Sequence, residues 1–316
     1  MSLKALVLRG IAFVALFIGF DQLAGVGFKT LYSHAGDKFE RENYMRYKMD
    51  ADVIVMGSSH ATHHYVPAIL QDSLQMSVYN CGQRGNGIIY EYGRLATIYQ
   101  RYTPKLVIVD IIETMDLIKE DNSRYLDFLK VDYGTNATVD SLFYAIDPIS
   151  RYKMLLNCYR YNSQFCDLVI NTVLKGRGRF QKDGYAPLHG SQLDKYKHQQ
   201  GQEKAGDKKA EAVEYDDLKL HCLERIAAEK REGCKMVFVL SPTHGQSSTA
   251  TQFEVVYDIC RRNGIPFLNY MNDPRFLGRD DLFYDRGHMN DDGARMFSSI
   301  VASDILLQVY GDAGEE

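Results

Sequence analysis

The chain contains no tryptophan, no Cys-x-x-Cys pair, no internal repeat and no excess of basic residues. Its net charge of −4 and pI near 6.2 leave no basic stripe to neutralise phosphates, so a nucleic-acid partner is not expected. The six cysteines lack zinc-ligand spacing, and free buried thiols are the default for them. Cys158 and Cys166 could bridge only in an oxidising compartment. The 22 tyrosines suit sugar binding, although ordinary packing explains them equally well.

Two further stretches lack the spacing of cofactor or metal sites. The glycines in Gly82-x-x-Gly85-x-Gly87 do not have the spacing of a dinucleotide-binding fingerprint. The cluster from His60 to His64 contains no carboxylate and lacks the His-Glu-x-x-His pattern. We therefore predict no cofactor and no metal, and we expect these histidines to face solvent or line a pocket.

The longest apolar stretch lies at the N-terminus. Lys4 and Arg9 precede a run from Gly10 to Phe28, which at about 1.5 Å per residue can just cross a hydrocarbon layer of ~30 Å. Asp21 lies inside this run and is costly at mid-bilayer but less so near an interface. Basic residues on the N-terminal side predict that this end stays in the cytoplasm, with the rest of the chain outside. We predict an uncleaved anchor at 1–28; the alternatives are a cleaved signal peptide and a buried helix, although no small-x-small cleavage site follows.

After the anchor, apolar strands alternate with helices. Residues 29–50 are polar and form a juxtamembrane segment, and strands are expected at about 52–56, 77–80, 105–112, 235–240 and 266–270. Strands that are apolar throughout indicate a parallel sheet covered on both faces. The predicted fold is therefore α/β, with a flavodoxin-like, doubly wound, five-stranded sheet in the order 2-1-3-4-5.

The α/β domain is expected to span 51–310, followed by a short tail at 311–316. A helical and loop insertion interrupts it at about 140–216. The second part of the insertion, 176–216, is polar and low in hydrophobic residues, which predicts either a lid or a plain solvated loop.

Two short stretches, far apart in the chain, together predict a catalytic site. The apolar run Val53–Met56 leads into Gly57-Ser58-Ser59, so Ser59 follows a buried strand. Asp285-Arg286-Gly287-His288 precedes the last helix, and one short turn can hold both the carboxylate and the imidazole. Such a carboxylate orients the ring while its other nitrogen faces the serine hydroxyl, which is the chemistry of a serine esterase.

Each stretch also has a purely structural interpretation. A serine at a strand-to-helix turn caps a helix well, so Ser58 or Ser59 could serve that role alone. Asp285 and His288 could belong to a surface turn before a helix capped by Asn290 or Asp291. The occurrence of both stretches in one chain favours the catalytic interpretation.

The two stretches resemble blocks of the SGNH (GDSL-like) hydrolase superfamily, over roughly residues 51–310. Gly57-Ser58-Ser59 corresponds to the first block, with Ser58 in place of the family's aspartate. In the second block, Asn80 is followed five residues later by Gly85, and the resemblance implies that the N–H groups of Gly85 and Ser59 form the oxyanion hole. Asp285, His288 and Asn290 match the last block.

The third block departs from the family pattern. Where the family has Gly-x-Asn-Asp after the third strand, this chain has Ile112-Glu113-Thr114-Met115-Asp116. The side-chain amide that completes the oxyanion hole is therefore absent, and Thr114 is a candidate substitute. His60, next to the nucleophile, and His244, after the fourth strand, are candidates for substrate contact.

The resemblance implies an extracytoplasmic serine esterase in which Ser59 attacks, His288 accepts the proton and Asp285 orients the ring. Envelope proteins that act on acylated polysaccharides resemble this combination of membrane anchor and Gly-Ser-Ser block. The expected substrate is an acyl ester, most simply acetyl, on a cell-envelope glycan. The alternatives are an acyltransferase of the same fold and a non-catalytic glycan-binding or assembly protein.

Overall fold

The structure is a computed structural model that describes residues 2–36, 38–173, 183–195, 214–245 and 253–311. Most of the polar stretch predicted as a lid or loop lies outside the described residues. The chain divides into two compact units: a helical unit of Met1–Lys48 and Leu126–Phe180, and an α/β unit of Met49–Tyr125 and Gln181–Glu316. The domain limits expected from the sequence stay a prediction.

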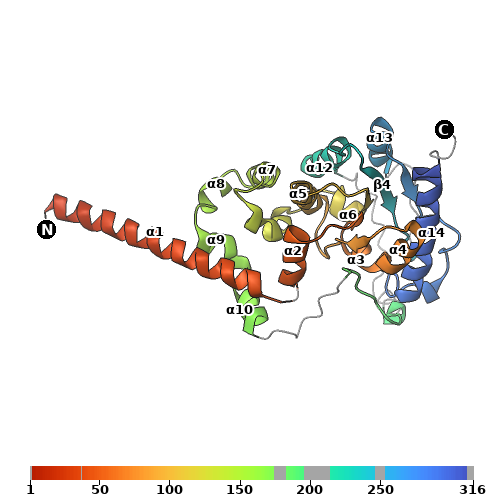
Figure 1. The fold of residues 1–316 in the computed structure, drawn as a ribbon, viewed down its shortest axis with the longest axis horizontal. Coiled ribbons are helices and arrows are strands. Elements are labelled where there is room, and N and C mark those ends of the chain that lie inside the picture. Colours follow the sequence, from red (N-terminus) through yellow and green to blue (C-terminus); the bar gives the residue numbers. More distant parts are fainter. Residues whose placement is uncertain (1, 37, 174–182, 196–213, 246–252, 312–316) are drawn as a thin grey trace, which may run out of the picture. The chain divides into compact units, whose positions relative to one another are not determined.

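The α/β unit is built on a five-stranded parallel sheet in the order β2-β1-β3-β4-β5, which confirms the predicted topology (Figure 1). The strands are β1 (Val53–Met56), β2 (Val78–Asn80), β3 (Leu106–Asp110), β4 (Lys235–Leu240) and β5 (Phe267–Asn269). The three central strands are almost wholly buried and rich in β-branched residues, because both sheet faces are covered by helices.

Helices pack on the two faces of this sheet. On one face, α14 (Asp291–Val309) packs against α3 (Ser59–His64) and α4 (Pro67–Leu74). Alternate strand residues such as Val55, Ile108 and Val239 share a buried cluster with Phe297 and Val301 of α14. Away from that cluster, α12 (Asp217–Ala228) packs against α5 (Ile88–Tyr99) and α13 (Glu254–Arg262). The short α6 (Glu113–Asp116) follows β3.

The helical unit begins with α1 (Leu3–His34) and α2 (Lys38–Tyr47), and continues with α7 (Ala137–Ile146), α8 (Ser150–Lys153), α9 (Asn157–Tyr161) and α10 (Phe165–Val173). The 3₁₀ segment Ser123–Asp132 leads into it. Its small core joins Tyr32, Phe39, Tyr161 and Leu168. All six cysteines are free thiols, Cys158 and Cys166 included.

The first helix has two different halves. Among the described residues, α1 is the one helix long and apolar enough to cross a membrane. Its second half packs on α9 and α10, as Figure 1 shows. Gly25 lies against the Asn157 side chain, so closely that a Cβ would come within 2.5 Å of it. The helix therefore continues past the predicted anchor limit at residue 28, because its last turns supply part of the helical unit's core.

Candidate active site

The turn after β1 brings two serines to the carboxyl edge of the sheet. Gly57 has φ +142°, and a Cβ there would approach the carbonyl oxygen of Asp110 to 2.8 Å, so this turn requires glycine. Ser58 is the N-cap residue of α3, but its hydroxyl makes no capping bond and instead donates to Met115 Sδ at 3.3 Å. Ser59 is the first helical residue and is half-buried. Neither serine hydroxyl therefore serves as the cap that the structural interpretation proposed.

Ser59, His288 and Asp285 form a continuous hydrogen-bonded chain. Ser59 Oγ lies 2.8 Å from His288 Nε2, and His288 Nδ1 lies 2.9 and 3.1 Å from the two Asp285 carboxylate oxygens. Because a carboxylate only accepts, Nδ1 carries the proton, which leaves the Nε2 lone pair to accept from the Ser59 hydroxyl. The side chains of His288 and Asp285 are 27% and 19% exposed, so a reactant from solvent can reach this chain.

The turn that carries the pair is fixed by its own backbone. One oxygen of Asp285 accepts the N–H groups of Gly287 and His288, both at 2.9 Å. Burial acts to raise the pKa of Asp285, but the bond and charge of His288 and these N–H groups outweigh it and hold that pKa below its usual range. Asp285 is therefore a carboxylate at neutral pH and holds His288 in one orientation.

Behind the ring, buried histidines support the same turn. Met289 N donates to His64 Nε2 at 3.0 Å, so the proton of neutral His64 is on Nδ1 and is donated to Ser241 Oγ, also at 3.0 Å. Burial, and then the charges of the neighbouring histidines, lower the pKa of His64 well below its usual value, which keeps it neutral. Ser241 Oγ lies 3.2 Å from His60 Nδ1, and the rings of His60 and His64 stack 4.6 Å apart.

His63 packs against the ring of His288. Its Nδ1–H donates to the carbonyl of Ala186 at 2.6 Å, and its ring meets that of His288 edge to face at 5.3 Å. Burial lowers the pKa of His63 to about 4. The three histidines of α3 are thus all buried, so of the two expected placements, facing solvent or lining a pocket, the first is wrong. Their spacing of three and four residues on a helix is the sequence signal that could have placed them on one face.

Among the described residues, no group of three or more His, Cys, Asp or Glu side chains is arranged to hold a metal ion. His60 is 6% exposed, and its Nδ1 lies 3.6 Å from Asp110. Asp110 in turn accepts from the Tyr65 hydroxyl at 2.6 Å. These contacts join the ends of β3 and α3 beneath the candidate nucleophile.

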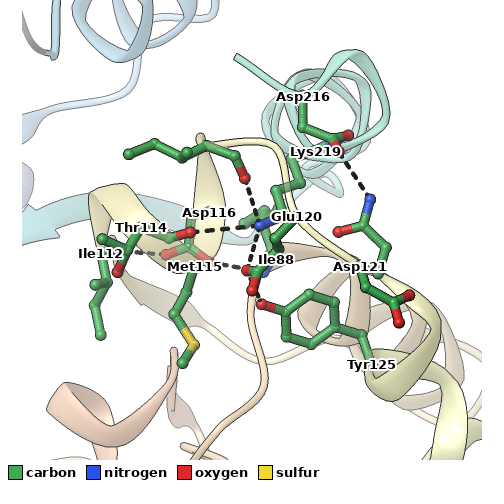
Figure 2. A network of polar contacts seen from close by, with 12 residues as sticks. Ile88, Ile112, Thr114, Met115, Asp116, Glu120, Asp121, Tyr125, Asp216 and Lys219 are labelled. Atoms are coloured by element: carbon green, nitrogen blue, oxygen red, sulfur yellow. Dashed lines mark hydrogen bonds and ion pairs between the residues drawn. The ribbon is translucent and has the colours of Figure 1, made fainter. Parts of the chain in front are cut away.

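The loop after β3, where the family pattern fails, is held by a buried polar network (Figure 2). Asp116 accepts the N–H groups of Ile112 at 2.6 Å and Ile88 at 2.8 Å. Burial raises the pKa of Asp116 to about 7, against the lowering effect of these two N–H groups. Lys219, fully buried, donates to the Ile118 carbonyl at 2.8 Å and to Glu120 at 2.7 Å. The loop is thereby fixed, and it presents no side-chain amide.

Thr114 lies in this loop with its side chain in an exposed position, and its carbonyl is 3.5 Å from Lys219 Nζ. Gly85 is exposed and has φ +73°, in the left-handed region that favours glycine. Asn80 lies at the end of β2, where the loop that carries Gly85 begins. Its amide donates to the carbonyls of Ala61 at 2.6 Å and Tyr65 at 3.0 Å. The roles predicted for Thr114 and Gly85 stay predictions.

His244 lies beside the turn that carries His288. Its backbone N–H donates to the Arg286 carbonyl at 2.9 Å, and its Nε2 lies 2.8 Å from Asp280. Its ring also meets Phe283 at 5.5 Å. His244, which follows β4, therefore lies at the carboxyl edge of the sheet as expected. Its role in substrate contact stays a prediction.

Comparison with known proteins yields matches among solved structures only. No family model matches the chain, and no curated protein matches it. Two structures of a family two carbohydrate esterase from Clostridium thermocellum, one of them an active-site mutant, match with 10% and 9% identity and a TM-score of 0.38 each. The first is in complex with cellohexaose. Each match covers 82% of this chain and 64% of the other chain, so this chain spans less than two thirds of those structures.

Proposed function

We propose that this protein is a membrane-anchored, extracytoplasmic serine esterase with Ser59 as nucleophile, His288 as general base and Asp285 as the residue that orients the ring. The observation that carries the proposal is the 2.8 Å distance between Ser59 Oγ and His288 Nε2, together with the 2.9 Å hydrogen bond between His288 Nδ1 and Asp285. A nucleophile bonded to a base that a third group orients is the arrangement required for acyl transfer.

In the proposed reaction, Ser59 Oγ attacks the ester carbonyl carbon while its proton passes to His288 Nε2. The tetrahedral intermediate collapses when the bond to the alcohol oxygen breaks and the imidazolium returns the proton to that oxygen. Water then attacks the acyl-enzyme, again giving its proton to His288, and the acid leaves as Ser59 recovers its hydrogen. Asp285 remains ionised throughout and stabilises the imidazolium.

The oxyanion would be held by the N–H groups of Ser59 and Gly85. Ser59 N–H is in the first turn of α3, where helix geometry supplies no intrahelical acceptor. Without the family's amide the site has one donor fewer, and such a loss costs about 3–4 kcal/mol in known oxyanion holes. We therefore expect turnover slower than that of an esterase with a complete set of donors.

The proposed substrate is an acyl ester, most simply an acetyl ester, on a cell-envelope glycan. This assignment rests on the resemblance of the sequence blocks and on the proposed location. The packing of α1 supports an uncleaved anchor over a cleaved signal. Cleavage near residue 28 would remove Asp21 and Gly25, which contact α9. It would also remove Phe28, whose ring stacks on Tyr161 at 5.2 Å.

The proposal is tested with the full chain in detergent micelles, by following acetate release from 4-nitrophenyl acetate and from O-acetylated oligosaccharides. The wild type and Ser58→Ala should release acetate, whereas Ser59→Ala should not. Acetate release that Ser59→Ala does not diminish would contradict the proposal. Adding an unacetylated oligosaccharide separates hydrolysis from transfer, because only a transferase forms the acetylated acceptor.

A further inference from the structure

The exposed half of α1 is one candidate membrane contact of the helical unit, and it indicates where a second one lies. Every large apolar residue from Leu3 to Phe20 along this half is exposed: Leu3, Leu6, Val7, Leu8, Ile11, Phe13, Val14, Leu16, Phe17, Ile18 and Phe20. At about 1.5 Å per residue this segment extends roughly 27 Å, close to the ~30 Å of a bilayer's hydrocarbon core. Beyond Phe20, one face of α1 is buried at Asp21 and Gly25, while Leu23 and Val26 on the other face stay exposed. If the chain is anchored as proposed, one boundary of the hydrocarbon layer therefore lies near residues 21–26, within the predicted run from Gly10 to Phe28.

Asp21 fixes which other residues lie at that level. It is 2% exposed and accepts the backbone N–H groups of Asn157 at 2.8 Å and Cys158 at 2.9 Å. The Asn157 side chain also donates to it, at 3.2 Å. The first residues of α9 are thus tied to the point where one face of α1 first becomes buried, and the residues just before α9 lie close to the same level.

The segment just before α9 has the composition of a membrane interface. Ile149, Tyr152 and Leu155 are spaced three residues apart on the short α8 turn and are 54%, 59% and 68% exposed. Basic residues alternate with them, at Arg151 and Lys153. Aliphatic and tyrosine side chains with neighbouring cations suit the headgroup region, where the rings and methylenes enter the lipid and the charges stay in water.

We propose that the α8 segment, defined as Ile149–Leu155, lies in the polar interface of the membrane that α1 crosses, with Ile149, Tyr152 and Leu155 facing lipid. The occupant is lipid because the segment is joined, through Asp21 and α9, to the lipid-exposed part of α1. The α8 segment and α1 together give the helical unit two membrane contacts and hence a fixed orientation on the bilayer. The proposal rests on the membrane attachment proposed above and is independent of the esterase chemistry.

The absence of tryptophan makes a direct test practical, because each Tyr→Trp or Phe→Trp variant has a single tryptophan fluorophore. The full chain is reconstituted in phosphatidylcholine vesicles containing lipids with a quencher at a shallow or a deep acyl position. Tyr152→Trp reports on the α8 segment, and Phe13→Trp reports on the middle of the exposed α1 half. Tyr47→Trp, at the end of α2, is the matched control because Tyr47 and Tyr152 are both 59% exposed.

We expect deep quenchers to act most on Phe13→Trp, and shallow quenchers to quench Tyr152→Trp several times more than Tyr47→Trp. Ile149→Trp and Leu155→Trp should repeat the Tyr152→Trp result, which guards against a misfolded single variant. Strong quenching of Phe13→Trp with equal, weak quenching of Tyr152→Trp and Tyr47→Trp would overturn this proposal and leave the anchor intact. Weak quenching of Phe13→Trp would overturn the anchor and this proposal together. Ester hydrolysis, measured separately, would be unaffected by either result.

Discussion

Asp285 of the α/β unit and Asp21 of the helical unit make nearly the same hydrogen bonds for different purposes. Each carboxylate accepts hydrogen bonds from the backbone N–H groups of two consecutive residues and from one side chain. The side-chain donor of Asp285 is a titratable ring, half-exposed and bonded to Ser59, whereas that of Asp21 is the neutral amide of Asn157. The carboxylate alone therefore does not identify a site; the group it orients does.

The two units also differ in how they bury charge. In the helical unit, the buried Arg46 is paired with Asp132 at 2.6 Å, an arrangement that fixes α2 to the segment 123–132. In the α/β unit, Glu91 is buried with no hydrogen-bond partner for either oxygen among the described residues. Burial, and then the charges of Asp116 and Asp110, raise the pKa of Glu91 well above its usual value. The buried Arg46 of the helical unit thus has a charged partner, whereas the buried Glu91 of the α/β unit is influenced by the charge of Asp116, in the loop that lacks the amide.

The largest effect expected from this comparison is that of Ser59→Ala. Removing the nucleophile should lower kcat roughly 10⁶-fold while the thermal melt stays nearly unchanged, because among the described residues the half-buried hydroxyl bonds to His288 alone. Ser58→Ala is the matched control, since its hydroxyl bonds to Met115 rather than to a base. Steady-state acetate release checks both variants. Equal losses in the two would refute the assignment of the nucleophile.

Asp285→Asn should lower kcat roughly 10⁴-fold, a smaller loss than that of Ser59→Ala, because Asp285 orients the base but does not react. The comparison is sharpened by Asp21→Asn, which replaces the other carboxylate and should leave kcat unchanged. Both variants are compared in the same ester assay. If Asp21→Asn proved as damaging to kcat as Asp285→Asn, the distinction between the two carboxylates would fail.

The part of the α/β unit's stability that depends on His63 should fall as the pH drops from about 6.5 to about 4. Burial lowers the pKa of His63 to about 4, whereas an unfolded histidine titrates near 6.5. In that window the unfolded chain binds a proton that the folded chain does not, so this contribution is fully present above pH 6.5 and decreases by about 3 kcal/mol towards pH 4. Urea unfolding at several pH values measures it. His63→Gln should remove this contribution, so the stability of the wild type relative to this variant should fall with pH across the window. The exposed His221→Gln should leave the pH dependence unchanged.

Asp21→Ala should have the smallest effect of the series, lowering the stability of the helical unit by about 2 kcal/mol. The variant leaves the N–H groups of Asn157 and Cys158 without their acceptor in a half-buried position. Thermal unfolding in detergent micelles reports the change, with the exposed Asp50→Ala as control. An unchanged melting temperature would show that Asp21 does not tie α1 to α9.

The sequence predicted the sheet because its strands are short apolar runs separated by helical segments. The apolar runs predicted all five strands, and the analogy with flavodoxin-like folds predicted their order. The approach of Ser59 to His288 followed from the same rule, because both stretches adjoin the carboxyl edge of one sheet. The sequence left the stretch after residue 28 as a juxtamembrane helix or linker, and it did not predict that α1 continues to His34, where Tyr32 packs with Phe39 and Tyr161.

Contacts between segments far apart in the chain could not be read from the sequence. The bonds from Met289 to His64 and from His64 to Ser241 join residues from three elements, and no local pattern marks them. The network of Asp116 and Lys219 depends likewise on α6 and α12 meeting in space. Such contacts are tertiary, so spacing identified the candidate catalytic residues but not the residues that hold them.

The most direct test of the central claim is to treat the full chain with a fluorophosphonate and identify the labelled residue by peptide mass mapping. A serine reacts with this probe only when a base activates it. We predict one adduct, on Ser59, that is lost in Ser59→Ala and His288→Ala and retained in Ser58→Ala. An unlabelled wild-type chain, or an adduct that persists in Ser59→Ala, would contradict the assignment of Ser59, His288 and Asp285 as a catalytic triad.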